Sequence, residues 1–186
     1  MASARVFQVA LVDRVSPVAD YFNPHTKNEI TYTIFDHLME IAKVTPGRFI
    51  PGPGWSYRPA HVQPHDVVIY FLLDSGQSLV RKKLGVEPPT TDGGCTYFNG
   101  AVTLSEVYVD GSMPATRLAN VAFHELMHNK LKLGDGMHVL GGVAAKPTQE
   151  NSRLNPESIG CQRRSSIPCR NTPKPWPSDS RPGSLV

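Results

Sequence analysis

The most constraining feature of this 186-residue chain is a short and almost continuous apolar run, DVVIYFLLD, at residues 66–74. A run of this length and composition predicts a β-strand, and the lack of polar alternation predicts that both of its faces are buried. Such a strand needs neighbouring strands on either side and other elements packed over it. We therefore expect a sheet with helices packed against it.

The segments around this run alternate between strand and helix patterns. Further strands are predicted at residues 6–12 and 101–109, and helices at residues 25–44, 75–85 and 112–133. The Pro- and Gly-rich segments 45–65 and 85–100 are predicted to be loops. This order predicts an α+β (α/β-like) fold, with a small mixed twisted sheet and packed helices.

The ends of the two long helices carry recognisable signals. Thr26, followed three residues later by Glu29, resembles a capping box at the start of the first helix. In the last helix, Ser112 is the expected N-cap, Pro114 suits the first turn, and Gly134 is the expected stop.

Charge and composition divide the chain into a body and a tail. The net charge is +3, but residues 151–186 hold six Lys/Arg and two Asp/Glu, so residues 1–150 sum to −1. A nearly neutral body argues against a nucleic-acid partner, which requires a clustered positive face. The tail is rich in Pro, Ser and Arg, which predicts disorder. We expect one domain over residues 1–150 and an appended tail over 151–186.

The chain shows no membrane-spanning run, and its N-terminal apolar segment is interrupted by Asp13, which favours a strand over a signal peptide. No membrane partner is expected. The protein is expected to be cytoplasmic as synthesised, or secreted without a signal peptide. Cys95, Cys161 and Cys169 are too few and too scattered to predict a disulfide framework, although the last two could pair in an oxidising environment.

The last predicted helix carries the sequence His-Glu-Leu-Met-His. His124 and His128 are four residues apart, which places both imidazoles on one face of a helix, where they can bind one zinc ion. Glu125 lies beside the first of them and can act as a general base that passes a proton to a leaving amine. Zinc would lower the pKa of a bound water toward about 7 and polarise a carbonyl.

The alternative is a helix whose two histidines serve packing or solubility. The context favours the zinc site, because the helix follows a predicted strand and has an apolar face that can pack on the core. This face is formed by Leu118, Val121, Ala122 and Leu126.

From residue 101 to residue 142, the chain resembles the zincin superfamily of metallopeptidases, through the motif His124-Glu125-x-x-His128. The resemblance implies a zinc peptidase fold in which the strand before the motif helix, here residues 101–109, forms the lip of a cleft. That strand would bind an extended peptide or protein substrate through its backbone. An asparagine directly after the second histidine, as Asn129 is here, is also typical of metallopeptidase domains in bacterial secreted effectors and toxins. The chain resembles these domains in this respect, and the resemblance implies a secretion-system or immunity partner.

A catalytic zinc site needs three protein ligands and one open position. The metzincin branch of zincins has a glycine and a third histidine at fixed positions, where this chain has Leu131 and Gly134. Three candidates follow: His138, Asp135 and Glu150. If the helix ends at residue 133, Asp135 has so little chain that its return to the metal would be strained, whereas His138 has about 16 Å of chain. Gly134 and Gly136 would allow the sharp reversal that this return requires. We therefore predict His138 as the third ligand, with Glu150 and Asp135 as alternatives.

Other polar residues carry weaker expectations. Four histidines lie before the motif helix, and we expect them to be surface or loop residues and not zinc ligands: His25, His37, His61 and His65. Tyr108 could donate to a developing oxyanion, but packing on the sheet is the favoured interpretation. Asp110 and Asp135 could orient a ligand imidazole.

The motif predicts a zinc metallopeptidase that hydrolyses peptide bonds. Two alternatives remain. A peptidoglycan-peptide hydrolase would use the same zinc site, and a non-catalytic zinc-binding interaction module would need no base at Glu125.

Overall fold

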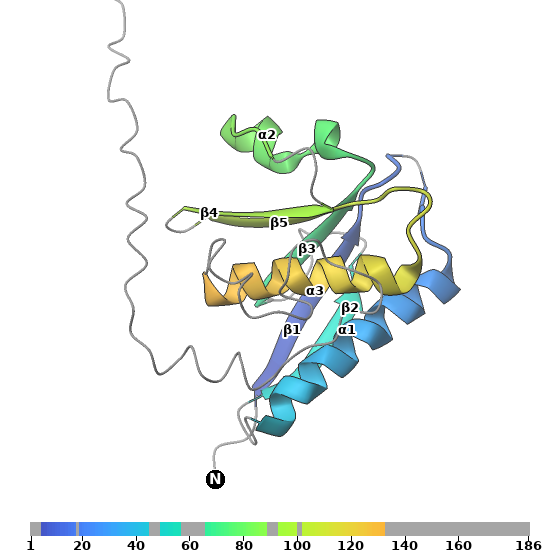
Figure 1. Ribbon diagram of the computed structural model, residues 1–186, viewed down its shortest axis with the longest axis vertical. Helices are drawn as coiled ribbons and strands as arrows, with labels where there is room; N and C mark the ends of the chain where they lie inside the picture. Colours follow the sequence, from blue (N-terminus) through green and yellow to red (C-terminus); the bar gives the residue numbers. More distant parts are fainter. Residues whose placement is uncertain are drawn as a thin grey trace, which may run out of the picture.

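A five-stranded sheet and its packed helices make up the part of the chain that can be described (Figure 1). The computed structural model describes residues 5–17, 19–44, 49–56, 66–88, 93–99 and 102–132. The strands are β1 (Arg5–Asp13), β2 (Phe49–Trp55), β3 (Val67–Leu72), β4 (Gly94–Asn99) and β5 (Val102–Tyr108). The helices are α1 (Pro24–Val44), α2 (Leu79–Leu84) and α3 (Ala115–Leu131), with a 3₁₀ turn, η2 (Ser75–Gln77), before α2. The predicted tail, residues 151–186, lies outside the described residues.

The sheet is mixed, as the sequence predicts. Its strands lie in the order β2–β1–β3–β5–β4. β1 pairs in parallel with β2 and β3, β3 pairs in parallel with β5, and β4 runs antiparallel to β5. Among the described strands, β2 and β4 therefore form the two edges of the sheet.

The apolar run forms β3, in the centre of the sheet, but the prediction that both faces are buried is wrong in part, because Val68 and Tyr70 on one face are only half-buried. Ile69 and Phe71 have no exposed surface. Phe71 packs against the rings of Phe22 and Trp55, at centroid distances of 5.5 Å and 5.2 Å. These contacts join the centre of the sheet to the start of α1 and the end of β2.

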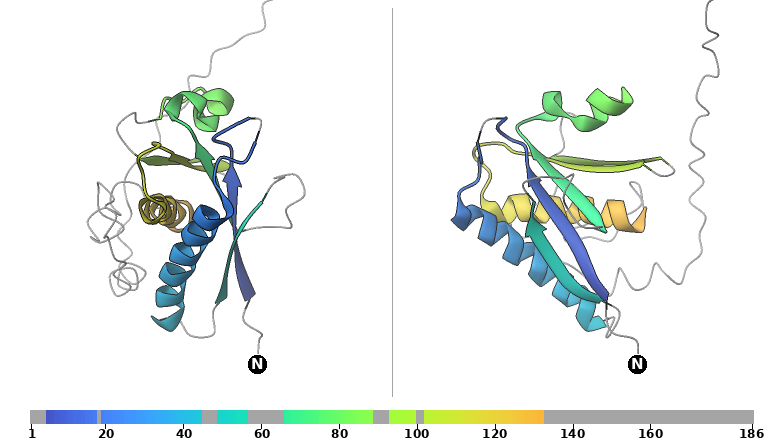
Figure 2. Two further views of the ribbon diagram at one scale, coloured as in Figure 1. Left: turned by 90° about the vertical axis from the view of Figure 1, so that its right-hand side faces the viewer. Right: turned by 180° about the vertical axis from the view of Figure 1, so that it is seen from behind.

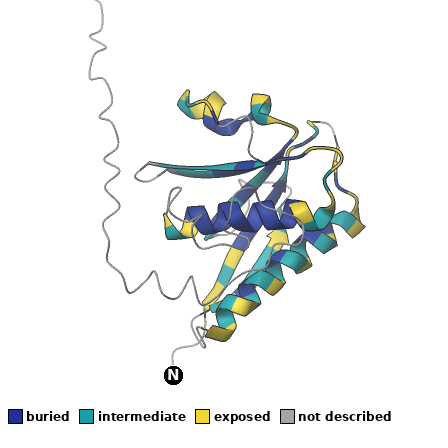
Figure 3. Cartoon of the chain, in the orientation of Figure 1, coloured by how far each residue is buried: buried dark blue, intermediate teal, exposed yellow. Residues whose placement is uncertain are grey.

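The two long helices, α1 and α3, lie against each other on one face of the sheet (Figure 2). Of the two, α3 is buried more continuously, from Leu118 to Asn129 (Figure 3). The short helix α2 contacts β5. No helix in the described ranges has both the length and the apolar character needed to cross a bilayer.

The predicted loops at 45–65 and 85–100 are wrong in part, because each contains an edge strand, β2 or β4. β2 includes Pro51 and Pro53, which lack the N–H that a central strand must donate. Because these prolines are two residues apart, both ring nitrogens point to the same side, and an edge strand can turn that side away from its single partner. The Pro- and Gly-rich composition therefore indicates an edge strand here, as well as a loop.

The predicted helix caps are also wrong. Asn23 precedes α1, and its Oδ1 accepts a hydrogen bond from the Thr26 backbone N–H at 2.9 Å. Asn23 is thus the cap, and Thr26 lies inside the helix. At α3, Pro114 occupies the N-cap position, while Ser112 donates its backbone N–H and its hydroxyl to Asp110. Asp110 therefore closes a turn before the helix.

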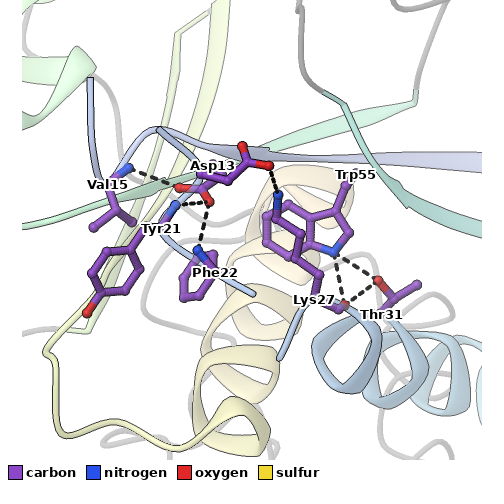
Figure 4. Close-up of polar contacts among 8 residues, drawn as sticks. Asp13, Val15, Tyr21, Phe22, Lys27, Thr31 and Trp55 are labelled. Atoms are coloured by element: carbon purple, nitrogen blue, oxygen red, sulfur yellow. Dashed lines mark hydrogen bonds and ion pairs between the residues drawn. The ribbon is translucent and has the colours of Figure 1, made fainter. Parts of the chain in front are cut away.

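The corner between β1 and α1 is held by charged side chains (Figure 4). Asp13, the last residue of β1, accepts hydrogen bonds from the backbone N–H groups of Tyr21 and Phe22 at 2.9 Å and 3.1 Å. The buried Lys27 pairs with Asp20 at 2.8 Å and lies 5.4 Å from the ring centroid of Trp55. These contacts fix the start of α1, the helix that supports α3.

Candidate metal centre

The two motif histidines lie on α3 and point toward the same place. Their Nε2 atoms are 3.1 Å apart, and their ring centroids are 4.7 Å apart with the rings nearly perpendicular. Two nitrogens bound to one zinc ion at tetrahedral angles would be about 3.3 Å apart. At the observed distance the two rings fit a shared ion, and without an ion one ring can donate a hydrogen bond to the other.

Both histidines are nearly buried, with 5% of His124 and 9% of His128 exposed. α3, which carries both histidines, packs against α1 and against the strands β3, β4 and β5. The apolar residues predicted to face the core, Leu118, Val121, Ala122 and Leu126, are all buried. This prediction from helical spacing is confirmed.

The three candidates for a third ligand, Asp135, His138 and Glu150, lie outside the described residues. Within the described ranges, no group of three His, Cys, Asp or Glu side chains is placed to hold a metal. The predicted helix end at residue 133 is wrong, because α3 ends at Leu131 and Lys132 adopts a left-handed conformation (φ 53°). Asp135 then has about 13 Å of chain after the helix, so reach alone no longer separates it from His138.

Glu125 lies next to His124 and turns toward β4. The hydroxyl of Thr96, in β4, is 2.7 Å from Glu125 Oε2 and 3.0 Å from the Glu125 backbone oxygen. Gly94, in the same strand, lies directly against the Glu125 side chain, because an added Cβ would lie 2.8 Å from Oε1. The candidate general base is therefore held between its helix and the edge strand.

The Thr96 hydroxyl also belongs to a longer polar chain. Its oxygen is 2.9 Å from Ser105 Oγ in β5, and Ser105 Oγ is 2.9 Å from Asn129 Nδ2 in α3. Ser105 and Asn129 are buried. The sequence offered Asn129 only as part of a motif pattern, and it gave no signal for Thr96, Ser105 or Gly94, which lie in other elements.

The strand predicted to form the lip of a cleft, β5, is not at an edge. It pairs with β4 on one side, and over Ser105–Tyr108 it pairs with β3 on the other side. That expectation is wrong. Of the strands that the structure describes, the edge strand on this side of the sheet is β4, which touches Glu125.

Tyr108 lies away from this centre. Side chains alternate between the two faces of β5, so Glu106 and Tyr108 lie on the face opposite Ser105 and α3. The Tyr108 hydroxyl donates to Glu106 Oε2 at 2.9 Å. Burial, together with the charge and hydrogen bond of Glu106, raises the pKa of Tyr108. The favoured interpretation, a tyrosine packed on the sheet, is confirmed.

The remaining histidines are placed as follows. His25 is exposed at the start of α1. His37 is half-buried, with Nε2 2.8 Å from Asn120 Oδ1 and its ring 4.9 Å from the ring of Phe123, so it contributes to the packing of α1 on α3. His61 and His65 lie outside the described residues.

Comparisons with known protein families, curated proteins and solved structures find no match to this chain.

Proposed function

We propose that this chain is a zinc-dependent metallopeptidase of the zincin kind, which hydrolyses peptide bonds with Glu125 as the general base. The observation that carries the proposal is the 3.1 Å approach of the two Nε2 atoms on a buried helix, with Glu125 beside them. His124, His128 and His138 would hold the ion. Bound zinc would polarise the substrate carbonyl and make an attacking water more acidic.

The surroundings of Glu125 suit a base that exchanges protons. Its carboxylate would take a proton from the attacking water and then deliver it to the leaving amine. A base that works in both directions must stay close to the reacting atoms, and Glu125 is held against β4 by Thr96 and Gly94. A purely structural zinc site has no need of such a residue, and would more often recruit cysteine ligands.

The substrate would bind as an extended strand along β4. In the described part of the sheet, the outer edge of β4 carries no neighbouring strand. An extended peptide can add to such an edge through backbone hydrogen bonds, which bind peptides of many sequences. β4 also contacts the helix that carries the two histidines, so an added peptide would lie on the side of the sheet where Glu125 is held.

The proposal is tested by measuring the zinc content and the hydrolysis of casein and of purified cell wall. The parent should bind one zinc ion and cut casein, and cleavage of cell wall alone would indicate the peptidoglycan alternative. Glu125→Gln should keep the zinc and lose activity by about 10²-fold or more. His124→Ala and His128→Ala should lose the zinc, whereas His25→Ala, at an exposed position on α1, is the matched control and should keep both.

Two results would overturn the proposal. If the parent binds one zinc and cuts neither substrate, the peptidase function fails. If Glu125→Gln cuts at the parental rate, Glu125 is not the base.

A further inference from the structure

We infer that Asn129, Ser105 and Thr96 form a one-directional hydrogen-bond chain that positions the carboxylate of Glu125. This inference rests on the proposed function, because it assigns positioning residues to the proposed general base. Its members come from α3, β5 and β4, so the chain links all three elements around the candidate centre.

The donor-to-acceptor direction of this hydrogen-bond chain is set first by Asn129. Its Nδ2 group can only donate, so Ser105 Oγ must accept at the 2.9 Å contact. Ser105 has no exposed surface, and among the residues that the structure describes the other hydrogen-bond partner of its hydroxyl is Thr96 Oγ1, at 2.9 Å. A buried hydroxyl that leaves its hydrogen without an acceptor is unfavourable, so Ser105 donates to Thr96.

The last hydrogen bond of this chain joins the Thr96 hydroxyl to Glu125. Thr96 has one hydroxyl hydrogen, and its oxygen accepts from Ser105, so its hydrogen turns toward Glu125. Of the two acceptors there, Oε2 at 2.7 Å is closer than the backbone oxygen at 3.0 Å. A hydrogen bond to a charged oxygen is also the stronger of the two. Thr96 therefore donates to the carboxylate.

Gly94 restricts the same carboxylate from another direction. The space that a Cβ would occupy at this position lies 2.8 Å from Oε1 and 2.9 Å from Cγ of Glu125. One oxygen is thus fixed by a hydrogen bond from Thr96, and the other lies against the bare backbone of β4. Held in this way, the side chain loses little rotational freedom when a reaction begins, which is the advantage of a preorganised base.

The test compares Thr96→Val, which removes the hydroxyl at nearly constant volume, with Thr96→Ser, which keeps it. In the zinc-loaded protein, Thr96→Val should retain one zinc per chain and fold, with kcat on a peptide lowered about 10- to 100-fold and KM changed less than about threefold. Thr96→Ser should restore kcat to within about threefold of the parent. Thr103→Val is the matched control in the neighbouring strand and should leave kcat unchanged.

A crystal structure of each zinc-loaded variant gives a readout that needs no activity. Thr96→Val should move the Glu125 carboxylate or give it several rotamers, and Thr96→Ser should keep the parental position. In Ser105→Ala, the disorder of the Glu125 carboxylate should lie between that of the parent and that of Thr96→Val, because Thr96 keeps its hydroxyl but no longer accepts a hydrogen bond from Ser105. If a folded Thr96→Val keeps the parental carboxylate position and kcat, the inference is wrong. If the parent lacks peptidase activity, the proposed function fails, and the carboxylate position still decides the inference.

Discussion

The carboxylate of Glu106, in the buried face of β5, accepts a hydrogen bond from the backbone N–H of Leu79 at 2.6 Å, across the first turn of α2. The same oxygen accepts from the backbone N–H of Val80, and the second oxygen accepts from the hydroxyls of Ser78 and Tyr108. A fully buried charge thus has four donors. This arrangement attaches α2 to the face of the sheet opposite α3.

Replacing Glu106 should destabilise the protein in a graded way. Glu106→Leu leaves two backbone N–H groups without an acceptor and should cost about 3–5 kcal/mol in the free energy of unfolding. Glu106→Gln can keep its oxygen toward the backbone, because the hydroxyls of Ser78 and Tyr108 can accept from its amide, and should cost about 1 kcal/mol. Urea denaturation measures both.

Glu40→Gln is the control for this series, because Glu40 pairs with Lys43 on the exposed side of α1. Its effect should stay within about 0.5 kcal/mol. Equal losses of unfolding free energy in Glu106→Leu and Glu40→Gln would contradict the role assigned to the buried carboxylate of Glu106.

The raised pKa of Tyr108 predicts a loss of stability in alkali. Burial, with the nearby Glu106 carboxylate, raises the pKa of Tyr108 above its value in the unfolded chain. A group whose pKa is raised on folding contributes stability that is complete below its unfolded pKa of about 10 and is lost as the pH rises further. Between pH 10 and pH 11.5, the unfolding free energy of the parent should therefore fall faster than that of Tyr108→Phe, by up to about 1.4 kcal/mol per pH unit. Parallel curves for the two proteins would contradict this prediction.

Adding one methyl group at Gly94 should disturb the candidate centre. A Cβ there would lie 2.7 Å from the backbone oxygen of Glu106 and 2.8 Å from Oε1 of Glu125. Because the first contact is with backbone, β4 must shift, and we expect Gly94→Ala to cost about 1–3 kcal/mol. Peptidase activity should fall about tenfold or more, since a small misplacement of a catalytic group is enough for such a loss.

Gly54→Ala, in the other edge strand, is the matched control, because a Cβ at Gly54 meets nothing within 4 Å. Its unfolding free energy should stay within about 0.5 kcal/mol of the parent. A Gly94→Ala protein as stable and active as Gly54→Ala would show that Glu125 does not need the close approach of β4.

The third ligand can be identified by zinc affinity. His138→Ala should weaken zinc binding about 100-fold or more, because a catalytic site depends on three protein ligands. Asp135→Ala and Glu150→Ala should each change the affinity less than about threefold. A competition assay with a chromophoric chelator measures all three. If His138→Ala binds zinc as tightly as the parent, the assignment of His138 is wrong.

The sequence predicts best what depends on local spacing. The apolar run of β3 and the helix pattern over residues 25–44 indicate elements that the structure contains, and the two histidines four residues apart lie on one helix face. Edge strands were missed because β2 and β4 lack the strong apolar pattern of a buried strand, and β2 contains prolines. The assignment of the cleft lip to β5 came from the zincin resemblance, and it failed because β4, which the sequence did not indicate, pairs along the other side of β5.

The polar chain around Glu125 could not be predicted, because its contacts join residues far apart in sequence. Thr96 and Glu125 are 29 residues apart, and Ser105 and Asn129 are 24 apart. Threonine and serine are ordinary strand residues, and no spacing rule connects a strand hydroxyl to a helix carboxylate. Only the pairing of β4 with β5, which sets Thr96 opposite Ser105, brings them together.

The position of β4 at the end of the described sheet has a consequence for the protein in solution. A strand edge without a neighbouring strand can pair with the same edge of a second molecule, which is a route to aggregation. The ammonium group of Lys132 lies 5.7 Å from the ring centroid of Phe98, near the end of β4, and contacts the hydroxyl of Thr103 in β5. A positive charge beside an edge strand discourages self-pairing, because two copies would bring like charges together. We therefore expect Lys132 to act as a gatekeeper that keeps concentrated protein monomeric, at a position where a helix would otherwise favour glycine.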